Sequence, residues 1–222
     1  MSATYSIDHE IAVITLDDGR ANAINPSMLS ALNAALNRAE KEARAVVITG
    51  RPERFSAGFD LKLMASATPE AITQLVDEGG RLALRLFTFP MPVIAACTGH
   101  SIAMGCFILL ACDVRLGVRG DYKIGANESA IHMTLPVFAL ELAKARISPP
   151  YLTQAIVNAK LFDPDEAVLA GYLDQVITRE RLLADAIATA EGLKALTSAV
   201  YARNKVLLRE ATIKAIASSL AS

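Results

Sequence analysis

The chain has 222 residues, of which 53% are hydrophobic and 20% charged, and its formal net charge at pH 7 is −1. A chain this long and this apolar can bury a substantial core, so we expect a single α/β domain and not a disordered protein. A net charge near zero offers no basic field to a phosphate backbone, and nucleic acid is therefore not an expected partner.

Ile11 to Leu16 is rich in β-branched residues and is followed by Asp-Asp-Gly, which predicts a strand and a turn. A helix is expected next, because Asn25 suits its cap and Pro26 suits its first position. The run 45–49, Ala-Val-Val-Ile-Thr, predicts a buried strand. The chain thus begins with a strand–helix–strand unit.

A second unit follows with the same order. Residues 50–64 form a loop with glycines that leads into a short helix, and Thr68 with Pro69 opens a longer helix that ends before Pro90. After it we expect a buried strand at 92–97, a helix at 102–112 that is buried on most sides, and two strands within 113–118 and 121–125.

Beyond Gly125 the pattern becomes mainly helical. The predicted helices cover 136–146, 150–159, 164–170 and two longer segments from residue 180 onward. Asp163 followed by Glu166 predicts a capping box at the start of one of them. YLDQVI, at 172–177, is the strand expected in this part, and no linker divides the chain.

The three cysteines and the apolar segments of the sequence indicate the cellular compartment of the protein. Cys97, Cys106 and Cys112 lie in apolar surroundings and are odd in number, which favours buried reduced thiols and a cytoplasmic protein. The N-terminal residues lack the basic and long apolar regions of a signal peptide. Residues 92–112 are long and apolar enough to be considered as a transmembrane segment, but glycines, a histidine and a serine interrupt them. We therefore expect no membrane partner.

Common cofactor motifs are absent from the sequence. Neither GxGxxG nor GxxxxGK[ST] occurs, and His9, His100 and His132 have no cysteine or carboxylate partner at ligand spacing. We therefore expect no metal site and no separate cofactor.

Ser101 lies in GHSIAMG, a near match to the G-x-S-x-G nucleophile elbow of serine hydrolases. In that fold the acid and then the histidine follow the serine, whereas His132 is the single histidine after Ser101, and Ala103 replaces the last glycine of the motif. A hydrolase stays an alternative, beside the simpler hypothesis that Ser101 caps the following helix.

Two strand-to-turn transitions, FSAGFD and SIAMGC, each precede a helix. Backbone N–H groups at a helix N-terminus are free and lie at the positive end of its dipole. Gly58 and Gly105 permit a tight backbone that leaves the amides of Phe59 and Met104 facing a ligand. If the two turns lie in contact, these two amides can bind an oxyanion. The alternative is that the two glycines are required only by the geometry of the turns and that no ligand binds there.

Four segments, in this order and at this spacing, resemble the enoyl-CoA hydratase/isomerase (crotonase) family: TLDDGRANAINPSML, VVITGRPERFSAGFDLKLM, PMPVIAACTGHSIAMGC and ACDVRLGV. The later IGANESAIHMTLP and LFDPDEAVLAGYLDQVI resemble in particular the Δ3,Δ2-enoyl-CoA isomerase branch. The resemblance covers most of the chain, although the C-terminus is shorter than usual for the family.

This resemblance implies an α/β fold, the crotonase (ClpP-like) spiral of ββα units with a helical C-terminal region. Residues 1–222 would form one domain, with a spiral core to about 145 and a helical oligomerisation region at about 146–222. The implied partners are an acyl-CoA thioester and further copies of the chain, in a homotrimer or a dimer of trimers. Coenzyme A would belong to the substrate, so no other cofactor is implied.

The resemblance also implies a set of site residues. The thioester carbonyl would bind between the amides of Phe59 and Met104. The matched substrate-binding positions are Ala23, Ala57, Gly58, Phe59, Asp60, Leu61, Lys62, Met104, Gly105 and Phe107. Lys62 would meet a phosphate of coenzyme A, or be a solvated surface lysine.

Hydratases of this family carry two glutamates, and the matching positions here are Phe107 and Glu128. Two carboxylates can orient a water for addition to a double bond, whereas one can take a proton from C2 or C4 and return it at the other end. The missing acid therefore favours double-bond isomerisation through a thioester enolate, with Glu128 as the acid/base. Its apolar neighbours would raise its pKa.

Other roles stay open at this stage. A lone glutamate is usually solvated or caps a helix. The chain could also be a hydratase in which another group orients the water, Glu141 being a candidate second acid, or an acyl-CoA-binding subunit without chemistry.

Overall fold

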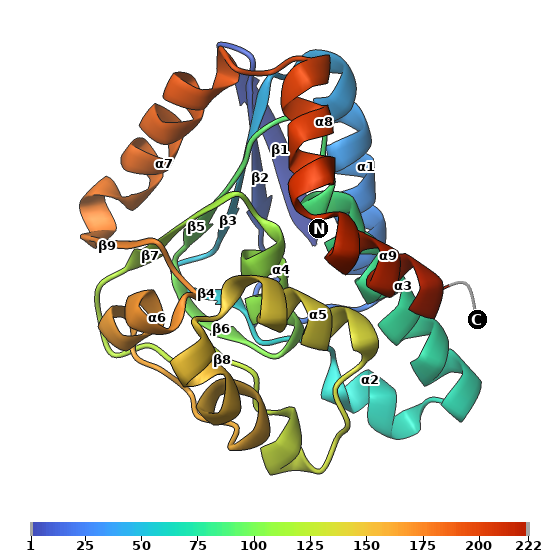
Figure 1. Cartoon of the computed structure of the whole chain (residues 1–222). Helices are drawn as coiled ribbons and strands as arrows, with labels where there is room; N and C mark the ends of the chain where they lie inside the picture. The colour runs from blue at the N-terminus through green and yellow to red at the C-terminus, as the bar shows by residue number, and fades with distance from the viewer. Residues whose placement is uncertain (1, 221–222) are drawn as a thin grey trace.

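The computed structural model describes residues 2–220, which form two sheets surrounded by helices (Figure 1). The strands are β1 (Ala3–Asp8), β2 (Ile11–Leu16), β3 (Ala45–Gly50), β4 (Glu53–Ser56), β5 (Val93–Cys97), β6 (Gly99–Ile102), β7 (Val114–Val118), β8 (Ile124–Gly125) and β9 (Gln175–Ile177). The α-helices are α1 (Pro26–Glu42), α2 (Leu61–Ser66), α3 (Pro69–Phe87), α4 (Met104–Ala111), α5 (Val137–Arg146), α6 (Pro164–Ala170), α7 (Arg179–Lys194), α8 (Ala199–Leu208) and α9 (Glu210–Ser219). Short helical turns are η1 (Glu128–Ile131), η2 (Pro149–Tyr151) and η3 (Thr153–Val157).

The larger sheet has the order β1-β2-β3-β5-β7-β9, and all its neighbours are parallel except β1 and β2. Every residue of β3 and β5 is buried, as expected for parallel strands covered on both faces. Helix α7 lies on one face and α1 on the other (Figure 1). Alternate strand residues therefore enter two separate cores: Val47 and Ile94 pack with α7, while Val46 and Ile48 join the larger core on the other face.

The smaller sheet is parallel and has the order β4-β6-β8. The pairs β3–β4, β5–β6 and β7–β8 each give one strand to the large sheet and the next strand to the small one, and helices follow. The predicted spiral of ββα units is therefore confirmed. It places the C-terminal ends of β4, β6 and β8 along one edge.

Helix capping follows the sequence closely. The side chains of Asn25 and Thr68 accept the N–H groups of Met28 and Ala71 at 3.0 and 3.3 Å, as expected of N-caps. Asp163 accepts the N–H of Glu166 at 2.8 Å, but the Glu166 carboxylate binds the Lys160 ammonium at 2.9 Å. The predicted capping box is thus half formed.

Four predictions of local structure are wrong. The helix expected at 150–159 is a 3-10 turn, η2, followed by a π-helical turn, η3, in which the Asn158 N–H bonds the carbonyl of Thr153 at 3.0 Å. The helix expected from residue 102 begins at Met104, because 99–102 form β6. Strand β4 lies in the segment expected to be a loop, and three helices occupy the region expected to hold two.

The C-terminal part of the chain is helical apart from β9, which extends the large sheet beyond β7. The division near residue 145 stays a prediction. No helix in residues 2–220 is long and apolar enough to cross a membrane.

Candidate active site

The two glycine-containing turns are in contact. Strands β4 and β6 pair in parallel, with Ser56 opposite Ser101, so both turns leave the small sheet at the same edge. Gly58 has φ +86°, and a Cβ built on it would lie 2.7 Å from the Cβ of Ala103 and 3.2 Å from the backbone nitrogen of Met104. A side chain at residue 58 would therefore separate the turns, which explains the glycine.

The amides of Phe59 and Met104 have no acceptor among residues 2–220. On either side of Phe59, the N–H groups of Gly58 and Asp60 bond acceptors within the protein at 3.2 and 3.0 Å. The N–H of Ala103 bonds the carbonyl of Gly125 at 3.0 Å, and Met104, as the first residue of α4, has no acceptor within its helix. Two free donors thus lie on adjoining turns, one of them at a helix N-terminus.

A cavity of about 120 Å³ lies beside these turns. Five sequence-predicted residues line it: Ala57, Phe59, Leu61, Phe107 and Glu128. All its other lining residues are apolar except Asn127 and Thr134. The cavity therefore combines an apolar wall with one carboxyl group, as expected of a small-molecule site.

Glu128 is the first residue of η1, and it is 8% exposed. Its Oε2 atom has no hydrogen-bond partner among the described residues. Burial raises the pKa of the Glu128 carboxyl above its ordinary value, against opposing hydrogen bonds from the backbone of Glu128 and Asn127. The carboxyl is therefore poised to carry a proton at a higher pH than a solvated glutamate.

Phe107 is 1% exposed and packs edge-to-face on Phe138, with ring centroids 6.1 Å apart. Its ring forms an apolar wall of the cavity. Phe107 occupies the position at which the resemblance to hydratases would place a second acid. Glu141 lies outside the lining residues and instead forms an ion pair with Lys144 at 2.8 Å. Among the described residues, Glu128 is the one acid that lines the cavity.

The remaining predicted binding residues lie around the cavity and do not line it. Asp60 caps α2 by accepting the N–H groups of Lys62 and Leu63, both at 3.1 Å, while the Lys62 side chain is exposed. The N–H of Ala23 bonds Asp18 at 3.0 Å. Asp60 thus has a structural role at the start of α2, and Ala23 has one in the turn that follows β2.

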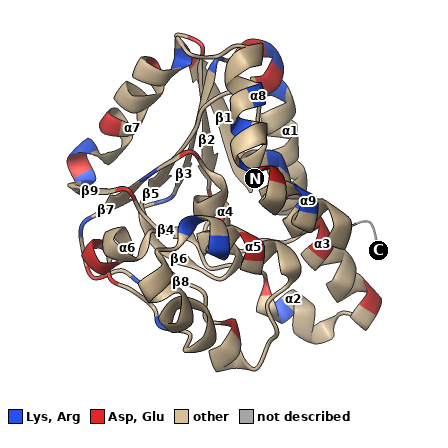
Figure 2. Ribbon diagram, in the orientation of Figure 1, with Lys and Arg blue, Asp and Glu red and all other residues tan. Residues whose placement is uncertain are grey.

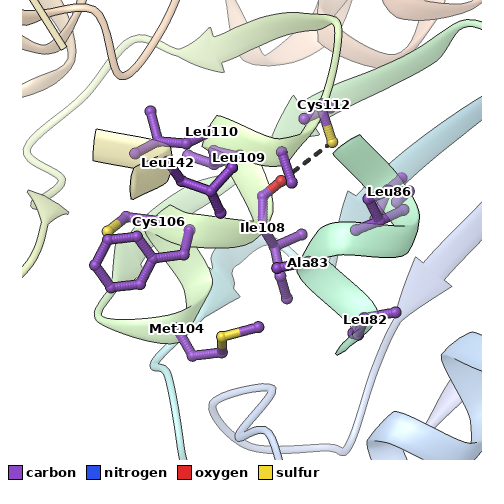
Figure 3. Close-up of a cluster of buried hydrophobic side chains, with 14 of the residues drawn as sticks. Leu82, Ala83, Leu86, Met104, Cys106, Ile108, Leu109, Leu110, Cys112 and Leu142 are labelled. Carbon is purple, nitrogen blue, oxygen red and sulfur yellow. Dashed lines mark hydrogen bonds between the residues drawn. The ribbon is translucent and has the colours of Figure 1, made fainter. Parts of the chain in front are cut away.

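Met104 and Gly105 act through their backbone. The Met104 side chain is 1% exposed and packs among core side chains of α3 and α4 (Figure 3), so its amide alone is available to a ligand. A Cβ on Gly105 would lie 2.5 Å from the Ser56 carbonyl oxygen. Gly105 is therefore needed where α4 passes close to β4.

Ser101 is not the cap of α4, which corrects one sequence hypothesis. It is fully buried in β6, and the N-cap of α4 is Ala103, which makes no side-chain capping bond. The Ser101 hydroxyl bonds no histidine within residues 2–220, and His100 accepts the N–H of Lys123 at 3.0 Å. The serine–histidine pair of a serine hydrolase is thus not formed within the described residues.

Two features of the site escaped the sequence analysis. Asn127 lines the cavity beside Glu128, and its Oδ1 has no partner among the described residues; its place next to Glu128 in the chain was the available signal. Gly79, inside α3, faces the Phe59 ring, and a Cβ there would lie 2.6 Å from the Cζ atom. Glycine in a helix interior is unfavourable, and that was the signal for this contact.

Comparison with known proteins identifies the family of the chain. A family model described as enoyl-CoA hydratase/isomerase matches residues 6–221. Human mitochondrial enoyl-CoA delta isomerase 1 is 29% identical over 206 residues, which are 91% of this chain and 68% of the human protein.

Solved structures of mycobacterial proteins are similar over nearly the whole chain. A protein of Mycobacterium tuberculosis titled enoyl-CoA isomerase is 38% identical with a TM-score of 0.94, and 99% of this chain and 96% of that chain are covered. A second structure of the same protein is titled probable enoyl-CoA hydratase. A protein titled enoyl-CoA hydratase from Mycobacterium marinum is 37% identical, with the same TM-score and the same coverage.

Proposed function

Because this chain belongs to the enoyl-CoA hydratase/isomerase family, and is thus an enzyme of the crotonase fold, we propose that it moves the double bond of an enoyl-CoA. The substrate class is the acyl-CoA thioester of the family. The observation that carries the proposal is a cavity with a single carboxyl group, Glu128, beside two free backbone donors.

In the proposed reaction the thioester oxygen of a 3-enoyl-CoA accepts the N–H groups of Phe59 and Met104. The Glu128 carboxylate removes a proton from C2, and the electron pair of that C–H bond delocalises into a dienolate whose charge lies on the thioester oxygen. The protonated Glu128 then returns the proton to C4, which leaves the double bond between C2 and C3. One carboxyl group completes the cycle, and no cofactor is consumed.

The amide pair lowers the barrier because it is already oriented in an apolar site. Such donors stabilise the charge that develops on the oxygen, and loss of one oxyanion donor typically costs about 10²–10³ in turnover. The raised pKa of Glu128 serves the same reaction, because the acid must both accept and return a proton.

Hydration of a 2-enoyl-CoA is the second candidate, because a relative at 37% identity is titled a hydratase and Asn127 has an unpartnered Oδ1 that can accept a hydrogen bond from water. Phe107 opposes it, since a phenyl ring cannot activate water.

The absorbance of the conjugated 2-enoyl thioester, followed over time, distinguishes isomerisation from hydration. With 3-hexenoyl-CoA an isomerase increases that absorbance, whereas with 2-hexenoyl-CoA a hydratase decreases it. Loss of the 2-enoyl signal, with no gain from the 3-enoyl substrate, would contradict isomerisation.

The other predicted binding residues stay part of the proposal. Ala57 and Leu61 would contact the substrate from the cavity wall, and the segment around Ala23, Asp60 and Lys62 would lie along coenzyme A. Lys62 is exposed and can reach a phosphate.

We also propose a homotrimer or dimer of trimers, because large apolar side chains of the last helices are exposed, among them Val200 (68%), Leu207 (57%) and Leu208 (85%). Light scattering tests this assembly. The cytoplasm is the proposed location, since the three cysteines are buried and free.

A further inference from the structure

Glu128 lies on η1, a single 3-10 turn, and it is the one charged residue of that turn (Figure 2). The N–H groups of Ala130 and Ile131 both bond the carbonyl of Asn127, at 3.0 and 3.3 Å. The turn ends at His132, whose φ of 58° is left-handed. Because a lone 3-10 turn has poor hydrogen-bond geometry and gains little from its own bonds, its position depends on the elements around it.

The Glu128 carboxylate follows any movement of this turn. It accepts the backbone N–H groups of Glu128 itself and of Asn127, which tie it to the backbone at the start of η1. The amides of Phe59 and Met104 lie elsewhere in the chain, at the starts of α2 and α4. Residues 129–132 are exposed, so η1 has solvent on one side. Whatever holds η1 in place therefore sets the distance between the base and the thioester.

The serine that follows the acid connects η1 to a second irregular turn. The Ser129 hydroxyl donates a hydrogen bond to the carbonyl of Ile156 at 3.2 Å. Ile156 lies near the end of η3, a π-helical turn, where a carbonyl has no N–H of its own helix to bond. Within residues 2–220 this is the one side-chain hydrogen bond from η1 to another element. Such π-helical turns are rare and often lie at functional sites.

The chain after η3 is fixed in turn to the strand that precedes η1. Phe162 and Ile124 of β8 exchange two backbone hydrogen bonds, both of 2.9 Å. The Phe162 ring is fully buried against Tyr151 and Tyr172, with ring centroids 6.2 and 5.7 Å apart. The segment that carries Glu128 is therefore held at two points, before the acid by Phe162 and after it by Ile156.

We propose that Ser129 is a positioning residue: its hydrogen bond to η3 holds the Glu128 carboxyl in place beside the two oxyanion amides. The proposal rests on the proposed function and deepens it. Ser129 does not line the Glu128 cavity, so it acts through Glu128 and not on the substrate.

Ser148 provides a matched control. Its hydroxyl donates to the carbonyl of Leu169 at 3.3 Å, and it does not line the cavity. Because each bond joins a serine hydroxyl to a backbone carbonyl of another element, Ser129→Ala and Ser148→Ala should lose similar stability in urea unfolding. Ser129→Ala alone should lower kcat for 3-hexenoyl-CoA, by about tenfold, since a misplacement of about 1 Å can cost about 10²-fold.

Two further readouts separate positioning from a loss of binding. Hexanoyl-CoA should bind Ser129→Ala as it binds the parent, because the cavity wall is unchanged. Ser129→Thr keeps the hydroxyl and should restore most of the lost turnover. Equal turnover in Ser129→Ala and Ser148→Ala, or a threonine variant as slow as the alanine variant, would overturn the proposal.

A titration of the free enzyme tests the same position without turnover. The Glu128 carboxyl is followed by NMR in protein labelled with carbon-13 at its glutamate carboxyls, and Glu128→Gln identifies the signal. Water reaches the carboxyl when η1 loosens, so its raised pKa should fall toward the ordinary 4.5 in Ser129→Ala and not in Ser148→Ala. Cys106 and Tyr172 also lie near Glu128, but burial raises the pKa of both, so they stay neutral in this range.

The titration also keeps the two proposals apart. If the parent isomerises no 3-enoyl-CoA, the proposed function is wrong, and the pKa of Glu128 still decides the role of Ser129. A pKa that is the same in Ser129→Ala as in the parent would show that the serine does not hold the carboxyl.

Discussion

Glu128 combines two properties at the scale of a single residue. Its carboxyl is buried and lines a cavity next to two backbone amides, and neither these amides nor the carboxyl's Oε2 atom has a partner among residues 2–220. Burial disfavours the charged form when the cavity is empty, yet the proposed first step needs that form. The pH dependence of the reaction follows from this opposition.

The first prediction concerns pH. Because burial raises the pKa of Glu128 above its ordinary value of 4.5, the ionised base is lost as pH falls through the raised pKa. We therefore expect kcat/KM with 3-hexenoyl-CoA to fall on the acid side with a midpoint above 4.5. A profile that stays flat down to pH 4.5, in an enzyme shown to be folded there, would contradict the assignment.

Gly58 offers a second prediction, with a matched control in the same chain. Gly58 and Gly19 have φ of +86° and +76°, but a Cβ on Gly19 meets nothing within 4 Å. Gly19→Ala should cost about 1 kcal/mol of unfolding free energy from backbone strain alone. Gly58→Ala should cost more, because its Cβ meets Ala103, and should lower turnover about 10²-fold by moving the amide of Phe59.

Both variants are compared by urea unfolding and by 3-enoyl-CoA isomerisation. Equal losses of stability and equal turnover in the two variants would show that contact between the turns is unimportant.

At the scale of elements, helix α3 supports the site through its two adjacent glycines. Gly79 leaves space for the Phe59 ring, and Gly80 leaves space for the Phe138 ring, whose Cδ1 would lie 2.8 Å from an added Cβ. Both rings line the Glu128 cavity. The two glycines lower the intrinsic helix propensity of α3, but they leave the space in which the two rings that line the cavity pack.

The third prediction compares glycines in two helices. Gly192, in α7, has nothing within 4 Å of an added Cβ, so Gly192→Ala should stabilise the protein by about 1 kcal/mol and leave turnover unchanged. Gly79→Ala should destabilise it and reduce kcat more than binding, because the displaced Phe59 carries an oxyanion donor. Thermal unfolding and steady-state kinetics measure both, and a Gly79→Ala variant with the stability and turnover of Gly192→Ala would overturn this role.

Elements differed in how far the sequence could predict them. Asn25, Thr68 and Asp163 act on groups three residues away, so helix starts were visible in the sequence. Strands β4 and β6 are short and pair in parallel across more than forty residues, so local patterns could not reveal them. The same reason hid the contact between Gly79 and Phe59, which exists in the folded molecule alone.

At the scale of the whole molecule, Asp113 ties the C-terminal helices to the core. It follows α4, and its carboxylate binds Lys205 of α8 at 2.6 Å and Arg209 at 2.8 Å. Lys205 also donates to two backbone carbonyls at 2.8 and 2.9 Å, and desolvation lowers its pKa although Asp113 opposes this. Helix α9 packs against α5 and α3 of the same chain (Figure 1).

The fourth prediction tests this buried cluster. Asp113→Asn leaves two buried cations without their counter-charge and should cost about 3–5 kcal/mol of unfolding free energy. Lys205→Met replaces one cation by an apolar side chain while Arg209 still pairs with Asp113, so its cost should be smaller. Urea unfolding at pH 7 measures both. A larger loss in Lys205→Met would mean that the lysine's carbonyl bonds, and not the charge balance, hold the helices.

The overall spiral could be predicted because the sequence resembles a family whose fold is known, and the comparisons bear this out. The docking of the last helices could not, because Asp113, Lys205 and Arg209 are far apart in the chain and each is an ordinary charged residue in sequence. Likewise, Phe59 and Glu128 were candidates by motif, but only the fold places them on one cavity.

The most direct test of the central claim is turnover of 3-hexenoyl-CoA by Glu128→Gln. We expect turnover to fall by about 10²–10⁴ while hexanoyl-CoA binds as in the parent. At pH 8 the variant should unfold at or above the parent's unfolding temperature, because the buried, ionised Glu128 carboxyl destabilises the folded parent at that pH. This destabilisation decreases as the pH falls below the raised pKa of Glu128. Turnover equal to the parent's, with binding unchanged, would contradict the role of Glu128 as the acid/base.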